Sequence, residues 1–195
     1  MIPLAPPAAS LLHPGYVAGR RYPAANASPQ NIAVTANRLN VVAHEIRAPI
    51  TVSGIGLNVS TGAAGLAKAG IYRFNADGGI SLIAECNADM DTTAAAQISA
   101  SFSANFTLNP GVYAVATCFN AAPTVTCQSN SVFGAVAFQG ATSYSAALVA
   151  GSLVSGAFVA LTYVSGPTAF FPATVATGSL SLSGSGFPIA ALLAA

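Results

Sequence analysis

Charged side chains are scarce in this sequence of 195 residues, and more than half of the chain has none. Lysine, arginine and the acids together make up 6% of the residues, whereas an ordinary soluble domain has roughly 25%. All bases lie between Arg20 and Arg73, all acids lie between Glu45 and Asp91, and no charge follows Asp91. An isolated domain of this kind would expose a wide uncharged surface, which favours association with a membrane or with other chains.

Residues 146–164 are the best candidate for a membrane span, because these 19 consecutive residues carry no charge and could cross a bilayer. Serine, threonine and glycine interrupt the stretch, however, no lysine or arginine flanks it, and its valine and aromatic residues suit strands. The N-terminal segment lacks the basic start of a signal peptide and is broken by prolines. We therefore expect no membrane contact, and the net charge of +1 gives no indication of a nucleic-acid partner.

Groups suited to catalysis are equally scarce, since the chain has two histidines and five acids. His13 lies in a proline-rich segment, and His44 precedes Glu45, so in a strand these two would point to opposite faces. Asp89 and Asp91 would share one strand face, but such a pair alone is more typical of a solvated loop than of a metal site. Neither a G-x-S-x-G elbow nor a phosphate-binding glycine loop is present. The sequence therefore predicts no enzyme activity, no metal and no cofactor.

Cysteine is rare as well, and its odd number and irregular spacing exclude a disulfide framework or a zinc site. Cys118 and Cys127 are close enough in sequence to face each other across a hairpin. The favoured interpretation is that Cys86, Cys118 and Cys127 are buried, reduced thiols.

Proline is concentrated at the start of the chain, where five prolines fall within the first 23 residues. Proline lacks the donor that a sheet needs and holds the chain near polyproline geometry, so residues 1–30 are predicted to form an extended arm. A disordered tail is the alternative, but apolar residues are unusual in a fully solvated tail. We predict instead that the arm docks on a neighbouring subunit. The predicted interface residues are Leu4, Leu11, Leu12, Tyr16 and Tyr22 of the arm, with Phe170 and Phe171 of the uncharged half.

Alternation with a period of two dominates the rest of the chain, and it is most regular from Gln97 to Leu108. One face of this strand would hold Ile98, Ala100, Phe102, Ala104, Phe106 and Leu108. Turn clusters such as Asn75–Gly79 separate the predicted strands, and residues 141–153 could hold a short helix. Other strands are expected at 32–43, 50–59, 67–74, 80–86, 112–119, 132–138, 157–164 and 180–183. Without amphipathic helices between them, these strands predict an all-β fold, an antiparallel β-sandwich or barrel over residues 31–195.

Several short motifs follow one another in a recognisable order. Asn37-Arg38-Leu39 and Ala48-Pro49 precede the strand 51–61, and a small-residue turn then leads to Gly70-Ile71-Tyr72. Further along, Asn109-Pro110-Gly111-Val112-Tyr113 opens another strand. In this order and spacing, residues 37–115 resemble a β module of tailed-bacteriophage structural proteins. Lys68 stands where that module usually has an arginine, and residues 116–195 have no counterpart in it.

The resemblance implies a jelly-roll-like sandwich that serves in the phage particle as capsid cement, head fibre or tail tip, commonly as a trimer. Together with the uncharged half and the docking arm, it favours a non-enzymatic capsid decoration protein that bridges capsid subunits. Such a protein would assemble in the host cytoplasm, form homotrimers and bind the major capsid protein on the outer surface of the virion. The alternative is a tail-fibre or spike tip that binds a host-surface glycan, with aromatic residues that include Tyr144, Tyr163, Phe170 and Phe171.

Overall fold

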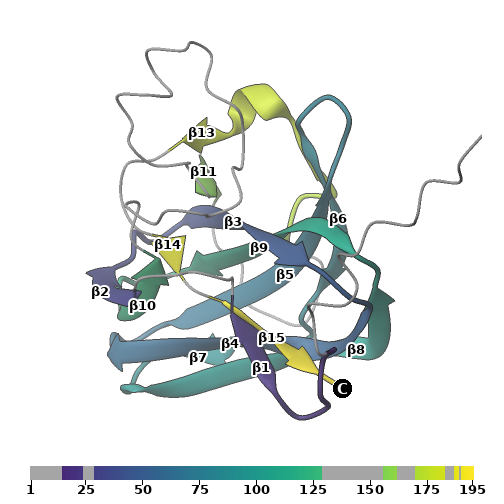
Figure 1. Cartoon of the computed structure of the whole chain (residues 1–195). Helices are drawn as coiled ribbons and strands as arrows, with labels where there is room; N and C mark the ends of the chain where they lie inside the picture. Colours follow the sequence, from purple (N-terminus) through teal and green to yellow (C-terminus); the bar gives the residue numbers. More distant parts are fainter. Residues whose placement is uncertain (1–14, 24–28, 129–155, 162–169, 183–186, 189) are drawn as a thin grey trace, which may run out of the picture.

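The computed structural model describes residues 15–23, 29–128, 156–161, 170–182, 187–188 and 190–195. These residues form strands joined by turns, with one short 3-10 turn, η2 (Thr177–Ser179), and without any α-helix. Every strand pairing between them is antiparallel, and the strands form two sheets packed on one core (Figure 1). The prediction of an all-β antiparallel sandwich is confirmed, whereas the jelly-roll connectivity stays a prediction.

The first sheet, called sheet A below, is built around one long strand, β4. Strand β8 pairs along one edge of β4, and β15 and β10 pair with successive parts of the other edge. Strand β1 extends the sheet beyond β15, so that the purple N-terminal strand lies beside the yellow C-terminal one (Figure 1). The strands are β1 (Arg21–Pro23), β2 (Pro29–Ala33), β4 (Ile50–Thr61), β8 (Ala96–Leu108), β10 (Thr124–Gln128), β14 (Phe187–Pro188) and β15 (Ala191–Ala194).

The second sheet, called sheet B, contains eight strands in the order β12-β6-β5-β9-β3-β11-β13, with β7 paired to β5. Its central strands β5, β9 and β3 pair in continuous register over most of their length. The strands are β3 (Arg38–Ile46), β5 (Leu66–Phe74), β6 (Ile80–Glu85), β7 (Met90–Asp91), β9 (Gly111–Phe119), β11 (Gly156–Ala160), β12 (Thr174–Val175) and β13 (Ser181–Leu182).

Sheet B is apolar on both faces, because successive side chains of its strands enter two different clusters. Its inner face contributes Ile71 and Val115 to the core shared with sheet A. Its outer face carries a second cluster that includes Leu39, Tyr72 and Ala116. Residues 170–180, which we call the C-terminal strap, cover this second cluster with Phe171, Val175 and Leu180. Part of the uncharged half of the chain is therefore buried within the same molecule.

Two irregularities let the long strands of sheet A keep their apolar side chains in the core. Strand β4 bulges at Ser53, so that Val52 and Ile55 both face inward although strict alternation would separate them. Opposite this bulge, strand β8 has additional residues. Ser101 pairs with Gly54 and Phe106 pairs with Val52, so that residues 102–105 of β8 lie opposite Ser53 alone. Ala104 lies in this irregular part and is exposed, so its predicted place on the buried face is wrong, while Ala100, Phe102 and Leu108 are buried as expected.

Several predictions fall outside the described residues: the strand at 132–138, the possible helix at 141–153, and most of the arm, including Leu4, Leu11 and Leu12. The described part of the arm is integrated into sheet A, since Arg21–Pro23 form β1. In the part of the chain that the structure describes, no helix has the length and apolar character needed to cross a membrane.

Candidate functional site

The outer face of sheet A is almost free of charge. Among the residues that the structure describes, the seven strands of this sheet contain one charged side chain, Arg21. Successive side chains of a strand point to opposite faces of the sheet. In β4, Ile55 and Leu57 point into the core, and short polar side chains such as Asn58 point outward. We call this surface the neutral face. It is defined by Thr51, Asn58, Gln97, Ser99, Ser101, Thr107 and Thr126.

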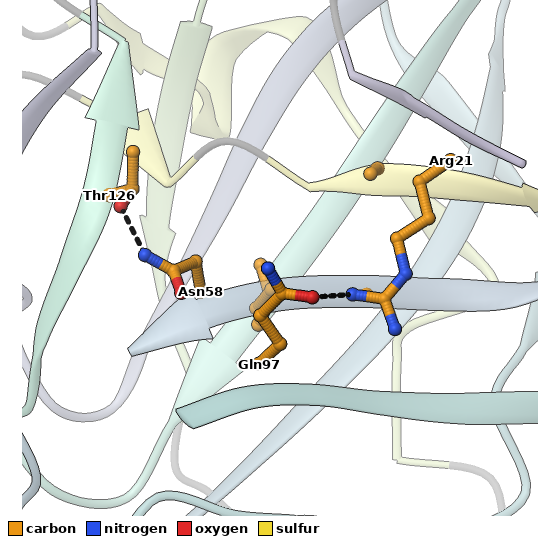
Figure 2. Close-up of a pocket in the computed structure, with 7 residues that line it drawn as sticks. Arg21, Asn58, Gln97 and Thr126 are labelled. Atoms are coloured by element: carbon orange, nitrogen blue, oxygen red, sulfur yellow. Dashed lines mark hydrogen bonds between the residues drawn. The ribbon is translucent and has the colours of Figure 1, made fainter. Parts of the chain in front are cut away.

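A groove of about 210 Å³ crosses the neutral face beside Arg21 (Figure 2). The guanidinium of Arg21 donates from Nη1 to Oε1 of Gln97 over 2.7 Å. On the other side, the Nδ2 amide of Asn58 donates to Oγ1 of Thr126 over 2.9 Å. The groove is lined by Arg21, Gly56, Leu57, Asn58, Gln97, Thr126 and Ala191. It therefore offers one cation, two amides and one hydroxyl to whatever touches this face.

Gly56 leaves space in the lining of the groove. A Cβ at this position would lie 3.4 Å from the Ile98 carbonyl oxygen and at least 3.6 Å from its next neighbours, which are ordinary contact distances. Alanine at position 56 therefore fits the fold and adds a methyl group to the groove lining. The substitution can test the groove without disrupting the sheet.

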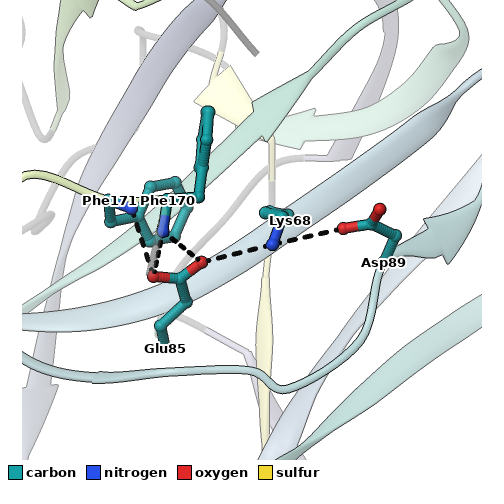
Figure 3. Close-up of polar contacts among 5 residues, drawn as sticks. All are labelled: Lys68, Glu85, Asp89, Phe170 and Phe171. Atoms are coloured by element: carbon teal, nitrogen blue, oxygen red, sulfur yellow. Dashed lines mark hydrogen bonds and ion pairs between the residues drawn. The ribbon is translucent and has the colours of Figure 1, made fainter. Parts of the chain in front are cut away.

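A buried charge cluster lies where the C-terminal strap meets strand β5 of sheet B (Figure 3). The ammonium group of Lys68 on β5 is 1% exposed and lies 3.4 Å from both Glu85 and Asp89. It also lies 5.6 Å from the centre of the Phe170 ring. The carboxylate of Glu85 accepts hydrogen bonds from the backbone N–H groups of Phe170 and Phe171 at 3.0–3.1 Å. This buried charge cluster thus ties the strap to sheet B.

The Gly70-Ile71-Tyr72 motif provides the seat for the same strap. A Cβ on Gly70 would lie 2.7 Å from the Phe171 ring, so a glycine is needed where the ring approaches the strand. The Tyr72 hydroxyl donates to the carbonyl of Pro172 over 3.0 Å. Burial, with a further contribution from Glu85, raises the pKa of the Tyr72 phenol well above its ordinary value. The motif therefore positions the strap through packing and one hydrogen bond.

Each of the five acids is engaged in a contact within the chain. Glu85 and Asp89 share Lys68, and Glu45 pairs with Arg47 over 2.9 Å. Asp77 and Asp91 each accept a hydrogen bond from a backbone N–H two residues later, and the bonds to Thr93 lower the pKa of Asp91. Asp89 faces Lys68 whereas Asp91 is exposed, so the two carboxylates do not converge. Within the described ranges, no three histidine, cysteine or acidic residues are placed to hold a metal ion.

His44 is buried on β3 and does not meet Glu45. It is 3% exposed, and its Nδ1 has no hydrogen-bond partner among the described residues. Burial lowers its pKa to about 4. The imidazole is therefore neutral at neutral pH and contributes apolar surface at the cost of one unsatisfied nitrogen.

The burial of His44 predicts a loss of stability in acid. In the unfolded chain the pKa of histidine is about 6.5, so below that pH the unfolded state binds a proton that the folded state excludes. Stability is therefore complete above pH 6.5 and falls as the pH approaches 4, by about 3 kcal/mol for this group. Urea unfolding at pH 7 and pH 4.5 measures the loss. His44→Leu should lose less stability over this range than the wild-type chain, and equal losses in the two proteins would contradict the assignment.

All three cysteines are buried free thiols, which agrees with the favoured interpretation of the sequence. Cys118 belongs to the outer cluster of sheet B and Cys127 to the core between the sheets, so the two do not face each other. Burial raises the pKa of each thiol to about 12.

The thiols should consequently be inert in the folded protein. Ellman's reagent at pH 8 is expected to label none of the three cysteines before unfolding and all three in guanidinium chloride. Rapid labelling of one thiol in the folded chain would show that this cysteine is accessible.

The predicted interface residues have varied surroundings. Tyr16 and Tyr22 contact each other edge to face with ring centres 4.7 Å apart, and both pack against the chain's own core. In the strap, Phe171 is buried against sheet B and Phe170 is half-buried, while Tyr144 and Tyr163 lie outside the described residues. The sequence did not reveal the groove. Arg21 could have pointed to it once the sheet was known, because the other described strands of sheet A contain no charged residue.

A scan against protein-family models gave no match, and a search of the curated proteins gave none either.

Proposed function

We propose that this chain is a non-enzymatic structural protein of a bacteriophage virion, most specifically a capsid decoration protein that stabilises the head by bridging capsid subunits. The observation that carries the proposal is the neutral face, an exposed sheet surface whose described strands carry a single charged side chain, Arg21. Covering hydroxyl and amide groups costs far less than covering charges, provided that the partner supplies hydrogen bonds. Such a face suits permanent burial against another chain.

The distribution of the ionisable groups supports a structural role. The acids hold turns, a surface ion pair and the strap in place, and His44 is buried and neutral at neutral pH, because burial lowers its pKa. Catalytic sites usually gather ionisable groups in one cleft. Among the described residues that line the groove on the neutral face, Arg21 is the one ionisable side chain. The resemblance of residues 37–115 to a phage β module adds an independent reason to look to a virion.

The area required for attachment is modest. A standard protein interface buries about 800 Å² on each partner. Burial of apolar surface stabilises the complex by about 25 cal/mol for each Å², so its gross contribution to the binding free energy is large. The ordering of side chains at the interface offsets much of this gain. Several copies that attach together would make release slow. Light scattering on the purified chain should give the mass of three copies, and a stable monomer would contradict the trimer.

The alternative of a tip that binds a glycan through aromatic residues receives less support. Phe171 is covered within its own chain and Phe170 lies against Lys68, so neither offers a free ring face of the kind on which a sugar stacks.

Deletion of the gene tests the proposed function. Phage particles that lack this protein should still assemble but should lose their DNA at a lower temperature or ionic strength, because capsid junctions are no longer bridged. Addition of the purified chain should restore resistance. Particles with unchanged stability and protein content would overturn the proposal.

A further inference from the structure

The groove beside Arg21 has the features of an anchor point within the neutral face. Residues that dominate binding energy in interfaces are often arginines in a recess, surrounded by neutral contacts that exclude water. Arg21 fits this description, since it lines the groove and the neighbouring strands of sheet A carry no other charge among the described residues. This inference rests on the proposed function, because it takes the neutral face to be the attachment surface.

The chemistry of the groove indicates an anionic partner. A guanidinium has five N–H donors, and Gln97 accepts from one of its nitrogens. None of the described lining residues is acidic, so the positive charge has no counterion within the groove. Arginine binds carboxylates through two parallel hydrogen bonds. A carboxylate that enters the groove would therefore complete the site.

The remaining lining groups favour a peptide as the bearer of that carboxylate. The amides of Asn58 and Gln97 can each donate and accept hydrogen bonds, and the hydroxyl of Thr126, which donates to Asn31, can accept, as the backbone of an extended segment requires. Gly56 lets such a backbone come close to the sheet. A second copy of this chain is a poor source of an extended acidic segment, because its acids lie in paired strands, in a turn or in the buried charge cluster around Lys68.

We propose that the groove lined by Arg21, Asn58, Gln97 and Thr126 receives an extended segment of a different protein, with an aspartate or glutamate bound by Arg21. In the virion, this segment belongs to the capsid subunit that the protein decorates. Arg21 supplies the charge-assisted contact, and the amide and hydroxyl groups fix the direction of the segment.

Two matched peptides test the chemistry of the groove. The probes are acetyl-Thr-Asp-Thr-amide and acetyl-Thr-Asn-Thr-amide, which differ only in the charged group, and binding is followed by ¹H–¹⁵N NMR of the full chain. The aspartate peptide should shift the side-chain signals of Arg21, Asn58 and Gln97 and bind at least about fivefold more tightly than the asparagine peptide. Arg21→Gln should abolish the preference, and Gly56→Ala should weaken the binding of both peptides.

The control is Arg20→Gln, which removes the adjacent exposed charge outside the groove lining and should keep the preference. Equal binding of the two peptides by the wild-type chain would overturn the proposal. So would equally tight binding of sodium acetate, which would indicate a simple anion site, or tighter binding of methyl β-glucuronide, which would indicate a sugar site.

Decoration of particles that lack the protein separates this inference from the proposed function. Wild-type chain should bind such particles, and Arg21→Gln should bind several-fold more weakly with a smaller dependence on salt. If the wild-type chain and Arg21→Gln bind these particles equally, the proposed function stands, but Arg21 does not anchor the protein to the capsid. If the wild-type chain does not bind at all, the proposed function fails, and the peptide experiment still decides the chemistry of the groove.

Discussion

Replacing Lys68 with methionine is expected to lower the free energy of unfolding by about 3–5 kcal/mol. The ammonium group is 1% exposed and lies between Glu85 and Asp89, which are themselves only 11% and 13% exposed in their side chains. Methionine fills a similar volume, so the principal change is the loss of positive charge. Two carboxylates would then remain in a site with little water, without the positive charge that both of them contact in the wild-type chain. Urea unfolding monitored by circular dichroism measures the effect.

Arg73 provides the matched control for this substitution. It lies on the same strand, β5, but its side chain is exposed. Arg73→Met removes the same charge and should change the stability by less than about 0.5 kcal/mol. Similar small effects of both substitutions would mean that the buried charge cluster contributes little, and that the strap is held by packing alone.

Truncation of Phe171 to alanine should cost about 3–5 kcal/mol, because the ring is 4% exposed and fills the outer cluster of sheet B. The variant also weakens the cover over Tyr72, whose ring lies 6.2 Å from that of Phe171. Thr174→Ala, at an exposed position in the same strap, should have little effect. Thermal or urea unfolding of the two variants checks the contrast.

The contact between Phe171 and Gly70 can be tested by a double-mutant cycle. Gly70→Ala places a Cβ 2.7 Å from the ring and should cost about 1–3 kcal/mol in the wild-type chain. In the Phe171→Ala background part of this penalty should disappear, since the ring is gone, while the 3.0 Å contact of the new Cβ with the Ala84 carbonyl oxygen remains. Additive effects would contradict the seating of the strap on the Gly-Ile-Tyr motif.

Much of the fold could be predicted because the alternation of apolar and polar residues along a strand matches the alternation of buried and exposed side chains in the sheet. The alternation of Ile98, Ala100 and Phe102 with serines predicted a half-buried strand, and these residues do line the core of sheet A. Ala104 was assigned wrongly because a bulge depends on the register of the partner strand, which the sequence of one strand does not specify. The fold class therefore followed from periodicity, and the bulges did not.

The groove and the seat of the strap were harder to predict because they combine residues distant in sequence. Phe170 and Phe171 are predicted interface residues of the uncharged half, and the sequence gives no sign that they lie over Lys68 and Gly70, about 100 residues earlier in the chain. Arg21, Asn58, Gln97 and Thr126 come from four strands that only the sheet topology brings together. The absence of charge after Asp91 indicated a contact surface, but it could not indicate which face of the sandwich forms it.

Electron cryo-microscopy of the phage particle that is proposed to carry this protein tests the central claim most directly. The account predicts that the chain lies on the outer surface of the head, with the neutral face of sheet A turned towards a capsid subunit and Arg21 in contact with a carboxylate of that subunit. A map in which the neutral face points into solvent, or in which the protein is absent from the head, would contradict the account.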